Sequence, residues 1–470
     1  MINKIILNKD FKELILHSKN YLGAEFISIL IGFIALPFYT RLLSPADFGI
    51  MSVFVSFVTL LSVILGLGMR GAILRYYYED NNDFYDFFNT NITLSFIVGS
   101  LLILIFFFFR QTIQDFFGIP LKLLYYGMLI SFFTVFIQLY QAYLQASNRS
   151  VVLSFQKIIQ VIIGVGGSLL IMSYLTSEKY YGRSHAMLAS VIVLTLIIFY
   201  RIRFFFSFSL KKKYLVYSLS FGLPIVLHLI SQNILTTFDQ VMINNILGER
   251  ETGLYSIAYR IGMIQNIIST ATLAAWTPIF YKKLNAKKFD DINSLTKKYL
   301  IIISLVASSL ILFSKEILIV FADKSYHEAV NIIPIVVFSY FFFFLYSIYV
   351  AYSFYDKKTK FISISTISIG VLNIILNYFL IPVFGYIGAA WSTLICYLLL
   401  FIIHYIYSKL NYKKFRTINF KFFFFPLLII SLAFYINILT NEIIQVSISE
   451  IILKVTLLLL FIFSIYKLKR

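Results

Sequence analysis

The sequence predicts an all-α integral membrane protein with about 14 transmembrane helices, arranged as two pseudo-symmetric six-helix lobes plus two C-terminal helices. Three observations lead to this fold class. The 470 residues are 60% hydrophobic and only 13% charged, with a mean hydropathy of +0.86, whereas soluble domains carry roughly 25% charged residues. Long apolar runs follow one another along the whole chain, and segments of the first half recur in the second.

The apolar runs define the predicted spans. A helix that crosses a bilayer needs about 20 predominantly apolar residues. Runs of this kind begin near Tyr21, Phe48, Asn89, Leu121, Val151, Ser184, Val216, Gly253, Tyr299, Ala329, Phe361, Tyr386, Phe420 and Ser447. The connections between them are short, so no soluble domain and no large loop carrying chemistry is expected.

The first twenty residues differ from a cleavable signal peptide. Lysines such as Lys4 and Lys12 are interspersed with apolar residues such as Leu7 and Phe11 at helical spacing. This pattern predicts a short amphipathic helix that lies on the cytoplasmic face of the membrane. A solvated helix without lipid contact is the alternative.

The distribution of positive charge predicts the topology. The net charge is +19, and most of the 40 Lys and Arg residues fall on one side when the loops are assigned alternately. The positive-inside rule then places both termini in the cytoplasm of a multi-pass protein. Anionic membrane lipid, and not nucleic acid, is the expected partner of the basic loops.

No motif for catalysis or nucleotide binding is visible. The chain lacks a phosphate-binding G-x-x-x-x-G-K-[ST] loop, and its single cysteine, Cys396, lies within an apolar run. We therefore expect no enzyme activity, no metal site, no cofactor and no use of ATP.

Two pairs of weakly similar segments indicate an internal repeat. The segment LLSPADFGIMS from Leu42 aligns with ILGERETGLYS from Ile246, and YGRSHAMLAS from Tyr181 aligns with FGYIGAAWST from Phe384. The two shifts are nearly equal, and six spans per repeat give parallel lobes. The predicted organisation is an N-terminal lobe over residues 1–205, a C-terminal lobe over 206–412 and two additional helices over 413–470.

Four stretches of the sequence resemble the polysaccharide exporters of the multidrug/oligosaccharidyl-lipid/polysaccharide superfamily. The N-terminal signature of these exporters is matched by GFIALPFYTRLLSPADFGIMSVF and LGLGMRGAILRYYYE, and their second half by FDQVMINNILGERETGLYSIAYRI and FGYIGAAWSTLICY. The resemblance implies a MATE-like fold and a Wzx-type flippase for O-antigen, lipopolysaccharide, capsule or exopolysaccharide repeat units. Such a flippase moves an undecaprenyl-pyrophosphate-linked oligosaccharide to the outer leaflet of the bacterial plasma (inner) membrane by alternating access. The expected partners are this lipid-linked glycan, membrane lipids, a polysaccharide polymerase and glycosyltransferases.

Polar stripes mark candidate cavity faces. Gln138 and Gln141 lie on one face of the fourth span, and His228, Gln232 and Asp239 lie on one face of the seventh. Polar side chains facing lipid are costly, so these faces are expected to line a wet cavity. Helix packing is the alternative.

Arg260 is the strongest candidate for binding the anionic substrate. It lies about seven residues into the eighth span, beside a stripe of Tyr255, Tyr259 and Asn266. The forked guanidinium suits a pyrophosphate. An ion pair with Asp239 or a side chain that snorkels to the surface are the alternatives.

Three further arginines, Arg41, Arg70 and Arg75, sit at span ends. They are candidates for the substrate cavity, and interface marking explains them equally well; the resemblance favours Arg41 and Arg75. Arg41 and Asp47 flank a predicted turn at Pro45, where their charge is either an interface marker or a gate.

Ion coupling and hinges have fewer candidates. Asp239 and Glu25 are the acidic groups nearest to span interiors and are candidates for Na⁺ or proton coupling, although Glu25 also fits an ordinary interfacial carboxylate. Pro37 and Pro224 lie in the first spans of the two halves and are predicted to break them and to act as hinges, with a static kink as the alternative.

Other functions stay open at this point. A multidrug or small-cation antiporter of the same superfamily would need an acidic, aromatic cavity, whereas the predicted interior is rich in arginine, glutamine and tyrosine. A flippase for the peptidoglycan lipid precursor shares the lipid anchor. A polymerase would need a large outward loop, and a channel a selectivity filter, and neither is visible.

Overall fold

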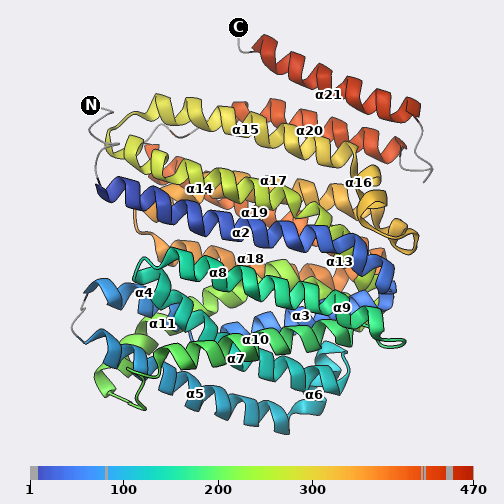
Figure 1. Cartoon of the computed structure of the whole chain (residues 1–470). Coiled ribbons are helices and arrows are strands. Elements are labelled where there is room, and N and C mark those ends of the chain that lie inside the picture. Colours follow the sequence, from blue (N-terminus) through green and yellow to red (C-terminus); the bar gives the residue numbers. More distant parts are fainter. Residues whose placement is uncertain (1–8, 80–82, 414–416, 418–419, 441–447, 469–470) are drawn as a thin grey trace. The chain divides into compact units, whose positions relative to one another are not determined.

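The computed structural model describes residues 9–79, 83–413, 417, 420–440 and 448–468, and every regular element in this part of the chain is a helix (Figure 1). The helices group into two compact units, residues 1–233 and 234–470. Helices are expected because lipid offers no partner for backbone N–H and C=O groups, which a helix satisfies internally.

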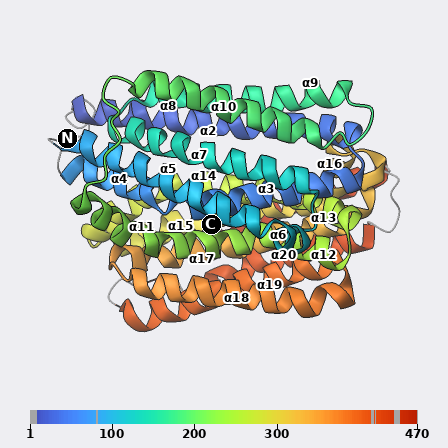
Figure 2. The ribbon, with the colours of Figure 1, turned by 90° about the horizontal axis from the view of Figure 1, so that it is seen from below.

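The first unit is built from α2 (Lys9–Leu42), α3 (Pro45–Gly66), α4 (Met69–Glu79), α5 (Phe84–Phe108), α6 (Arg110–Phe117), α7 (Leu121–Ala146), α8 (Ser150–Val161), η1 (Ile162–Gly166), α9 (Gly167–Tyr174), α10 (Tyr181–Ile202) and α11 (Lys212–Asn233). Here α7 packs against α3 and α10, and α2 packs against α8, as Figure 2 shows from below. Element η1 is a π-helical turn that joins α8 and α9.

The second unit is built from η2 (Ile234–Phe238), α12 (Asp239–Ile246), α13 (Glu249–Gly262), α14 (Ile264–Asn285), α15 (Phe289–Leu312), α16 (Ser314–Phe321), η3 (Lys324–Asn331), α17 (Ile332–Tyr355), α18 (Thr359–Phe384), α19 (Tyr386–Asn411), α20 (Lys421–Thr440) and α21 (Ile448–Leu468). Helix α19 packs against both α17 and α18, and α20 and α21 pack against α15.

Within the described residues, twelve helices are long and apolar enough to cross a membrane. The spans expected near Gly253 and Ser447 correspond to α13–α14 and to α21, which are not among the twelve. Helix α13 has only 14 residues and carries Glu249, Arg250 and Glu251. The multi-pass membrane character is confirmed, whereas the count of 14 stays a prediction.

The boundary between the units differs from the expected lobe boundary near residue 206. Helix α11 packs against α3, α4 and α5, so the division falls at Asn233. The assignment of lobes over 1–205, 206–412 and 413–470 stays a prediction. Lys9 and the residues after it continue directly into the first span as α2, and residues 1–8, with Lys4 and Leu7, lie outside the described residues.

The turn between α2 and α3 is a capping box. The Ser44 hydroxyl accepts a hydrogen bond from the Asp47 backbone N–H at 3.1 Å, and the Asp47 carboxylate accepts one from the Ser44 backbone N–H at 3.3 Å. Pro45 begins α3, where its missing N–H costs nothing. Asp47 therefore serves to cap the first turn of α3. Arg41 is exposed in the last turn of α2.

Neither predicted hinge proline interrupts its helix. Helix α2 runs through Pro37 and α11 runs through Pro224. A proline inside a helix removes one backbone hydrogen bond, and the neighbouring turns keep the helix intact. The irregular stretch of the seventh span lies instead at η2, a π-helical turn directly before Asp239. The hinge roles stay predictions.

Helix α11 approaches the α3–α4 junction backbone to backbone. Gly68 has φ +66°, and a Cβ built there would lie 2.4 Å from the Gly222 carbonyl oxygen; a Cβ built at Gly222 would lie 2.1 Å from the Leu67 carbonyl oxygen. Only glycine at both positions permits this contact.

A clasp of side chains also fastens α4 to α11. Tyr217 Oη donates to Glu79 Oε2 at 2.6 Å, and Arg75 Nε donates to Glu79 Oε1 at 2.6 Å. The Arg75 guanidinium also lies 5.3 Å from the centre of the Phe221 ring. The Tyr217 hydrogen bond and the Arg75 hydrogen bond hold the pKa of the Glu79 carboxyl below its usual value.

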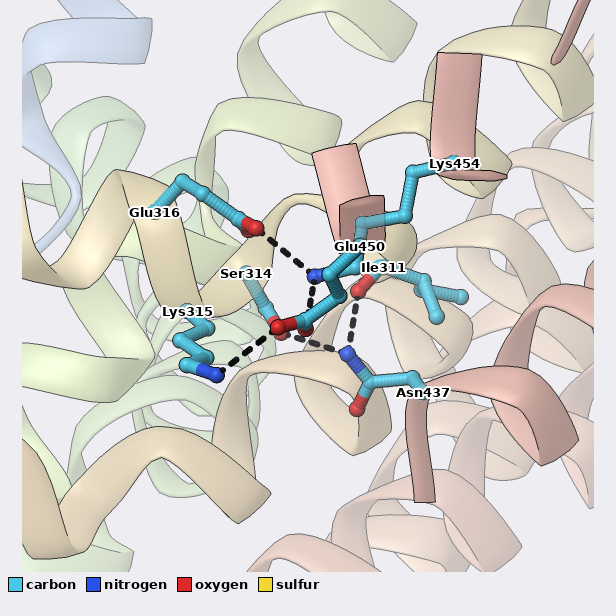
Figure 3. Close-up of polar contacts among 7 residues, drawn as sticks. All are labelled: Ile311, Ser314, Lys315, Glu316, Asn437, Glu450 and Lys454. Atoms are coloured by element: carbon cyan, nitrogen blue, oxygen red, sulfur yellow. Dashed lines mark hydrogen bonds and ion pairs between the residues drawn. The ribbon is translucent and has the colours of Figure 1, made fainter. Parts of the chain in front are cut away.

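Four charged side chains join α21 to α16, and we call them the ionic cluster (Figure 3). Lys454, fully buried, lies 2.8 Å from Glu316 Oε1 and 2.9 Å from Glu450 Oε1, while Lys315 lies 3.2 Å from Glu450 Oε2. Asn437 of α20 donates to the Ile311 carbonyl oxygen at 2.7 Å, at the end of α15. Two positive and two negative charges balance, as burial in an apolar environment requires.

Candidate functional site

The second unit contains a fully buried carboxylate, Asp239, at the first position of α12. Three side chains donate hydrogen bonds to it: Tyr255 Oη to Oδ2 at 2.7 Å, Thr393 Oγ1 to Oδ2 at 2.8 Å and Asn377 Nδ2 to Oδ1 at 2.6 Å. The donors come from α13, α19 and α18. One acidic residue therefore connects four helices, and we call this group the Asp239 node.

A second layer of amides and hydroxyls surrounds the node. Asn373 and Asn377 are four residues apart on α18 and so lie on one helix face. Asn377 Nδ2 donates to Asn373 Oδ1 at 3.3 Å, Asn373 Nδ2 donates to Ser392 Oγ at 3.4 Å, and Ser392 Oγ donates to Asn377 Oδ1. All these side chains are buried. Small polar residues of this kind hold apolar helices together.

Three tyrosines in contact with one another extend the node. The rings of Tyr255 and Tyr259, one turn apart on α13, have centroids 5.5 Å apart. Tyr340 Oη of α17 donates to Tyr259 Oη at 2.8 Å. The structure thus brings together three residues predicted for the site, Asp239, Tyr255 and Tyr259.

All donors to Asp239 are neutral. Within the described part of the chain, no lysine, arginine or histidine forms an ion pair with its carboxylate. An isolated carboxylate in a low-dielectric interior carries a large desolvation cost, which a proton or a bound cation removes. The arrangement is therefore able to take up a proton or a hard cation through oxygen ligands.

The first unit contains a cavity of about 360 Å³ between α3, α7, α8, η1 and α10. Its polar lining consists of Thr59, Ser62, Thr134, Gln138, Gln160, Arg183 and Ser190. Among the described residues that line it there is a guanidinium, and there is no carboxylate. The cavity therefore presents positive charge together with amide and hydroxyl groups.

The predicted arginines have separate surroundings. Arg70 is exposed and its Nη2 lies 3.5 Å from Gln145 Oε1, at the limit of a hydrogen bond. Arg75, on α4, belongs to the clasp between α4 and α11, and Arg41 is exposed. Arg260 is partly exposed on α13 and has contacts of its own.

The remaining predicted residues are spread over both units. Gln138 lines the cavity of the first unit, and Gln141, one turn further along α7, is partly buried. His228 is partly buried, Gln232 is exposed on α11, and Asn266 is partly buried on α14.

The predicted stripe from His228 to Asp239 is divided by the π-helical turn η2, which shifts the register of the helix. Glu25 is exposed and forms an ion pair with Lys157 at 2.6 Å, as an interfacial carboxylate would.

Two groups of residues were missed by the sequence analysis. Arg183 was counted in a loop because the sixth span was expected to begin at Ser184, whereas α10 begins at Tyr181. The i,i+4 pair Asn373 and Asn377 in an apolar span was a detectable signal, but its contact with Asp239 depends on tertiary packing.

Comparison with known families gives two matches. Residues 20–284 match the family described as polysaccharide biosynthesis protein, and residues 224–379 match the MatE family. A protein of the Lsg locus of Haemophilus influenzae is 27% identical over 283 residues, which is 57% of this chain and 66% of that protein.

Two solved structures share the fold. The lipid II flippase MurJ in an inward closed conformation has a TM-score of 0.74 and 18% identity, covering 97% of this chain and 100% of that chain. An inward-facing multidrug resistance MATE family transporter of the MOP superfamily has a TM-score of 0.65 and 17% identity, covering 83% and 95%. The predicted all-α, MATE-like fold class is confirmed.

Proposed function

Because the chain belongs to the polysaccharide biosynthesis protein family, we propose that it flips polyprenyl-pyrophosphate-linked oligosaccharide repeat units across the bacterial plasma membrane. The family match, together with the multi-pass MOP-type fold, supports a transporter and not an enzyme. The repeat units would feed synthesis of a surface polysaccharide such as O-antigen, lipopolysaccharide or exopolysaccharide. The lobes would alternate in access between the leaflets.

The observation that carries the proposal is the charge of the cavity in the first unit. Its described lining holds Arg183, two glutamines and several hydroxyls but no acidic side chain. An organic cation would need a carboxylate or an open aromatic surface. Pyrophosphate and sugar hydroxyls instead match guanidinium and amide donors. This favours the lipid-linked glycan over the multidrug or small-cation antiporter as the function.

We assign further substrate contacts to the predicted arginines. Arg260, Arg41, Arg70 and Arg75 lie within the stretch that matches the family. A pyrophosphate carries at least two negative charges, and its passage through an apolar protein is stabilised by fixed cations. Arg75 would have to exchange its bond to Glu79 for the substrate.

Ion coupling is assigned to the Asp239 node. The carboxylate is buried among neutral donors, so its occupancy by Na⁺ or H⁺ changes the local charge by one unit. Hydroxyl and amide oxygens of Thr393, Asn373 and Asn377 provide the ligand type that hard cations prefer. Uptake of the ion would bias the arrangement of α12, α13, α18 and α19, which the node connects.

The proposed orientation follows the basic loops, with both termini in the cytoplasm. Membrane lipids surround the helices, and a polysaccharide polymerase and glycosyltransferases are the expected partners on the two sides of the membrane. A peptidoglycan precursor flippase is the second candidate, because the same fold occurs in the lipid II flippase.

The test is translocation in proteoliposomes. The full chain is reconstituted, and fluorescent undecaprenyl-pyrophosphate oligosaccharide, peptidoglycan lipid precursor and ethidium are compared under Na⁺ and proton gradients. We expect transport of the oligosaccharide lipid, loss of transport in Arg260→Ala, and loss of gradient dependence in Asp239→Asn. Asp115→Asn, at an exposed acidic residue of α6, is the matched control.

The other outcomes decide between the alternatives. Transport of the peptidoglycan precursor alone supports the second candidate. Export of ethidium without movement of either lipid refutes the flippase function and supports a cation antiporter instead. Unchanged gradient dependence in Asp239→Asn removes the coupling role from the node.

A further inference from the structure

Arg183 is held in a fixed orientation by a chain of hydroxyl groups. Its Nη1 donates to Tyr39 Oη at 2.7 Å, and the Tyr39 hydroxyl is hydrogen-bonded to Ser168 Oγ. Ser168 Oγ donates its own proton to the Val165 carbonyl oxygen at 2.7 Å, so the Tyr39 proton points to Ser168 and the Tyr39 oxygen accepts from Arg183. The π-helical turn η1, which contains Val165, thereby anchors the guanidinium.

The other edge of the same guanidinium has unmet hydrogen-bonding capacity. Arg183 Nε is shielded from solvent and has no hydrogen-bond partner, and among the described residues no Asp or Glu pairs with this arginine. Ser62 lines the same cavity, is 5% exposed and likewise has a hydroxyl oxygen without a partner. Buried polar groups in proteins are almost always satisfied, and a polar ligand seated in this cavity would provide partners for both groups.

We propose that the cavity of the first unit is a subsite that binds an oxyanion of the transported lipid-linked glycan through the Nε–Nη2 edge of Arg183. This inference rests on the proposed flippase function. Because Nη1 is already bonded to Tyr39, the Nε–Nη2 edge offers two parallel N–H donors, which match the two oxygens of a carboxylate or phosphate. Gln138 and Gln160 line the same cavity and provide donors and acceptors for sugar hydroxyl groups.

The size of the cavity limits the ligand. Small-molecule sites occupy about 300–1,000 Å³, and this cavity of about 360 Å³ is at the small end of that range. It suits a short piece of glycan rather than a whole repeat unit. The oxyanion has two sources in the substrate, the carboxylate of an acidic sugar and the pyrophosphate linker.

Equilibrium binding of soluble probes to the full chain in phosphatidylcholine nanodiscs tests the proposal and distinguishes the sources. The probes are glucuronate, glucose as its neutral match, and inorganic pyrophosphate, with affinity measured by calorimetry or saturation-transfer NMR. We expect glucuronate to bind more tightly than glucose and its affinity to fall at least tenfold in Arg183→Gln. Arg110→Gln, at an arginine of α6 outside the cavity lining, should bind as the wild type does.

A second variant leaves the charge in place. Thr134→Leu adds an apolar side chain to the cavity wall and should weaken glucuronate binding while Arg183 stays intact. Both variants are first checked for monodisperse behaviour. If pyrophosphate and not glucuronate binds in an Arg183-dependent manner, the site serves the linker; if neither probe depends on Arg183 or on Thr134, the proposal is overturned.

The failure of this proposal can be told apart from the failure of the flippase function. Arg183-dependent binding of glucuronate without any translocation of lipid-linked glycan leaves the subsite standing and refutes the transport function. Translocation that proceeds normally in Arg183→Gln, together with no Arg183-dependent binding, refutes the subsite and leaves the flippase function standing.

Discussion

The contact of α11 with the α3–α4 junction leads to our most specific prediction, for Gly222→Ala. The added Cβ would lie 2.1 Å from the Leu67 carbonyl oxygen and 3.2 Å from its carbonyl carbon. Carbon and oxygen atoms in the closest ordinary contacts are about 3.3–3.6 Å apart. The obstacle is backbone and cannot rotate away, so α11 has to move by about 1 Å or more from Leu67.

The magnitude follows from the cost of overpacking. Inserting a methyl group into a closely packed contact costs about 1–3 kcal/mol. The better helix propensity of alanine, about 1 kcal/mol, favours α11 equally with and without the contact, so it cancels between the two arrangements. We therefore expect the arrangement with the contact to lose about 5- to 150-fold in relative population.

The distance between α4 and α11 is the measured quantity. Spin labels are placed at Tyr78 and Val216, which are 69% and 59% exposed, in a Cys396→Ala background, and EPR distances are recorded in nanodiscs. Gly222→Ala should add a longer-distance population, and Gly222→Val should enlarge it. Gly32→Ala is the matched control, because a Cβ built at Gly32 has no neighbour within 4 Å.

The reasoning is refuted if Gly222→Ala and Gly32→Ala give the same distance distribution as the parent protein. A change in translocation without a change in distance would equally contradict it, because the predicted effect acts only through this contact. Loss of folded protein is detected separately by gel filtration of the labelled sample.

Three further predictions concern the cap, the clasp and the ionic cluster. Ser44→Ala removes the capping box and should cost about 1 kcal/mol, seen as faster hydrogen exchange in the first turn of α3; unchanged exchange would contradict it. Because hydrogen bonds from Tyr217 and Arg75 lower the pKa of Glu79 below its usual 4.5, the clasp is complete above that value and is lost only as pH falls through the lowered pKa. The EPR distance should therefore stay constant from pH 7 to 5 and change at lower pH, and a midpoint above 4.5 would be inconsistent with this. Lys454→Met leaves Glu316 without its cation and should destabilise the docking of α21 by about 3–5 kcal/mol, measured by hydrogen exchange of α21, whereas adding Glu316→Gln should restore most of the protection.

The course of the helices was largely predictable because the membrane imposes strong rules. The predicted starts at Leu121 and Tyr386 coincide with the first residues of α7 and α19. A lipid environment forces long apolar segments into helices, so composition alone indicates them. The prediction was weaker at the eighth span, which was expected to begin near Gly253, because the structure divides this region into α13, with Glu249 and Glu251 in its first turn, and α14.

The site was less predictable than the fold. Asp239 was identified as an unusual acid, but its partners Asn377 and Thr393 lie more than 130 residues away and meet it only through packing. The face shared by His228 and Asp239 was inferred from 3.6 residues per turn, and the π-helical turn η2 disturbs that period. Helical periodicity in the sequence predicts neither a local irregularity of a helix nor a contact between helices that are distant in the sequence.

The ionic cluster has a consequence for biogenesis. Charged residues raise the free energy of inserting a helix into a membrane, and α21 carries Glu450 in its first turn and Lys454 four residues later. Their partners Lys315 and Glu316 belong to a segment synthesised more than 130 residues earlier. The segment of α16 therefore leaves the ribosome before α21, so the counter-charges of Glu450 and Lys454 are already synthesised when α21 emerges.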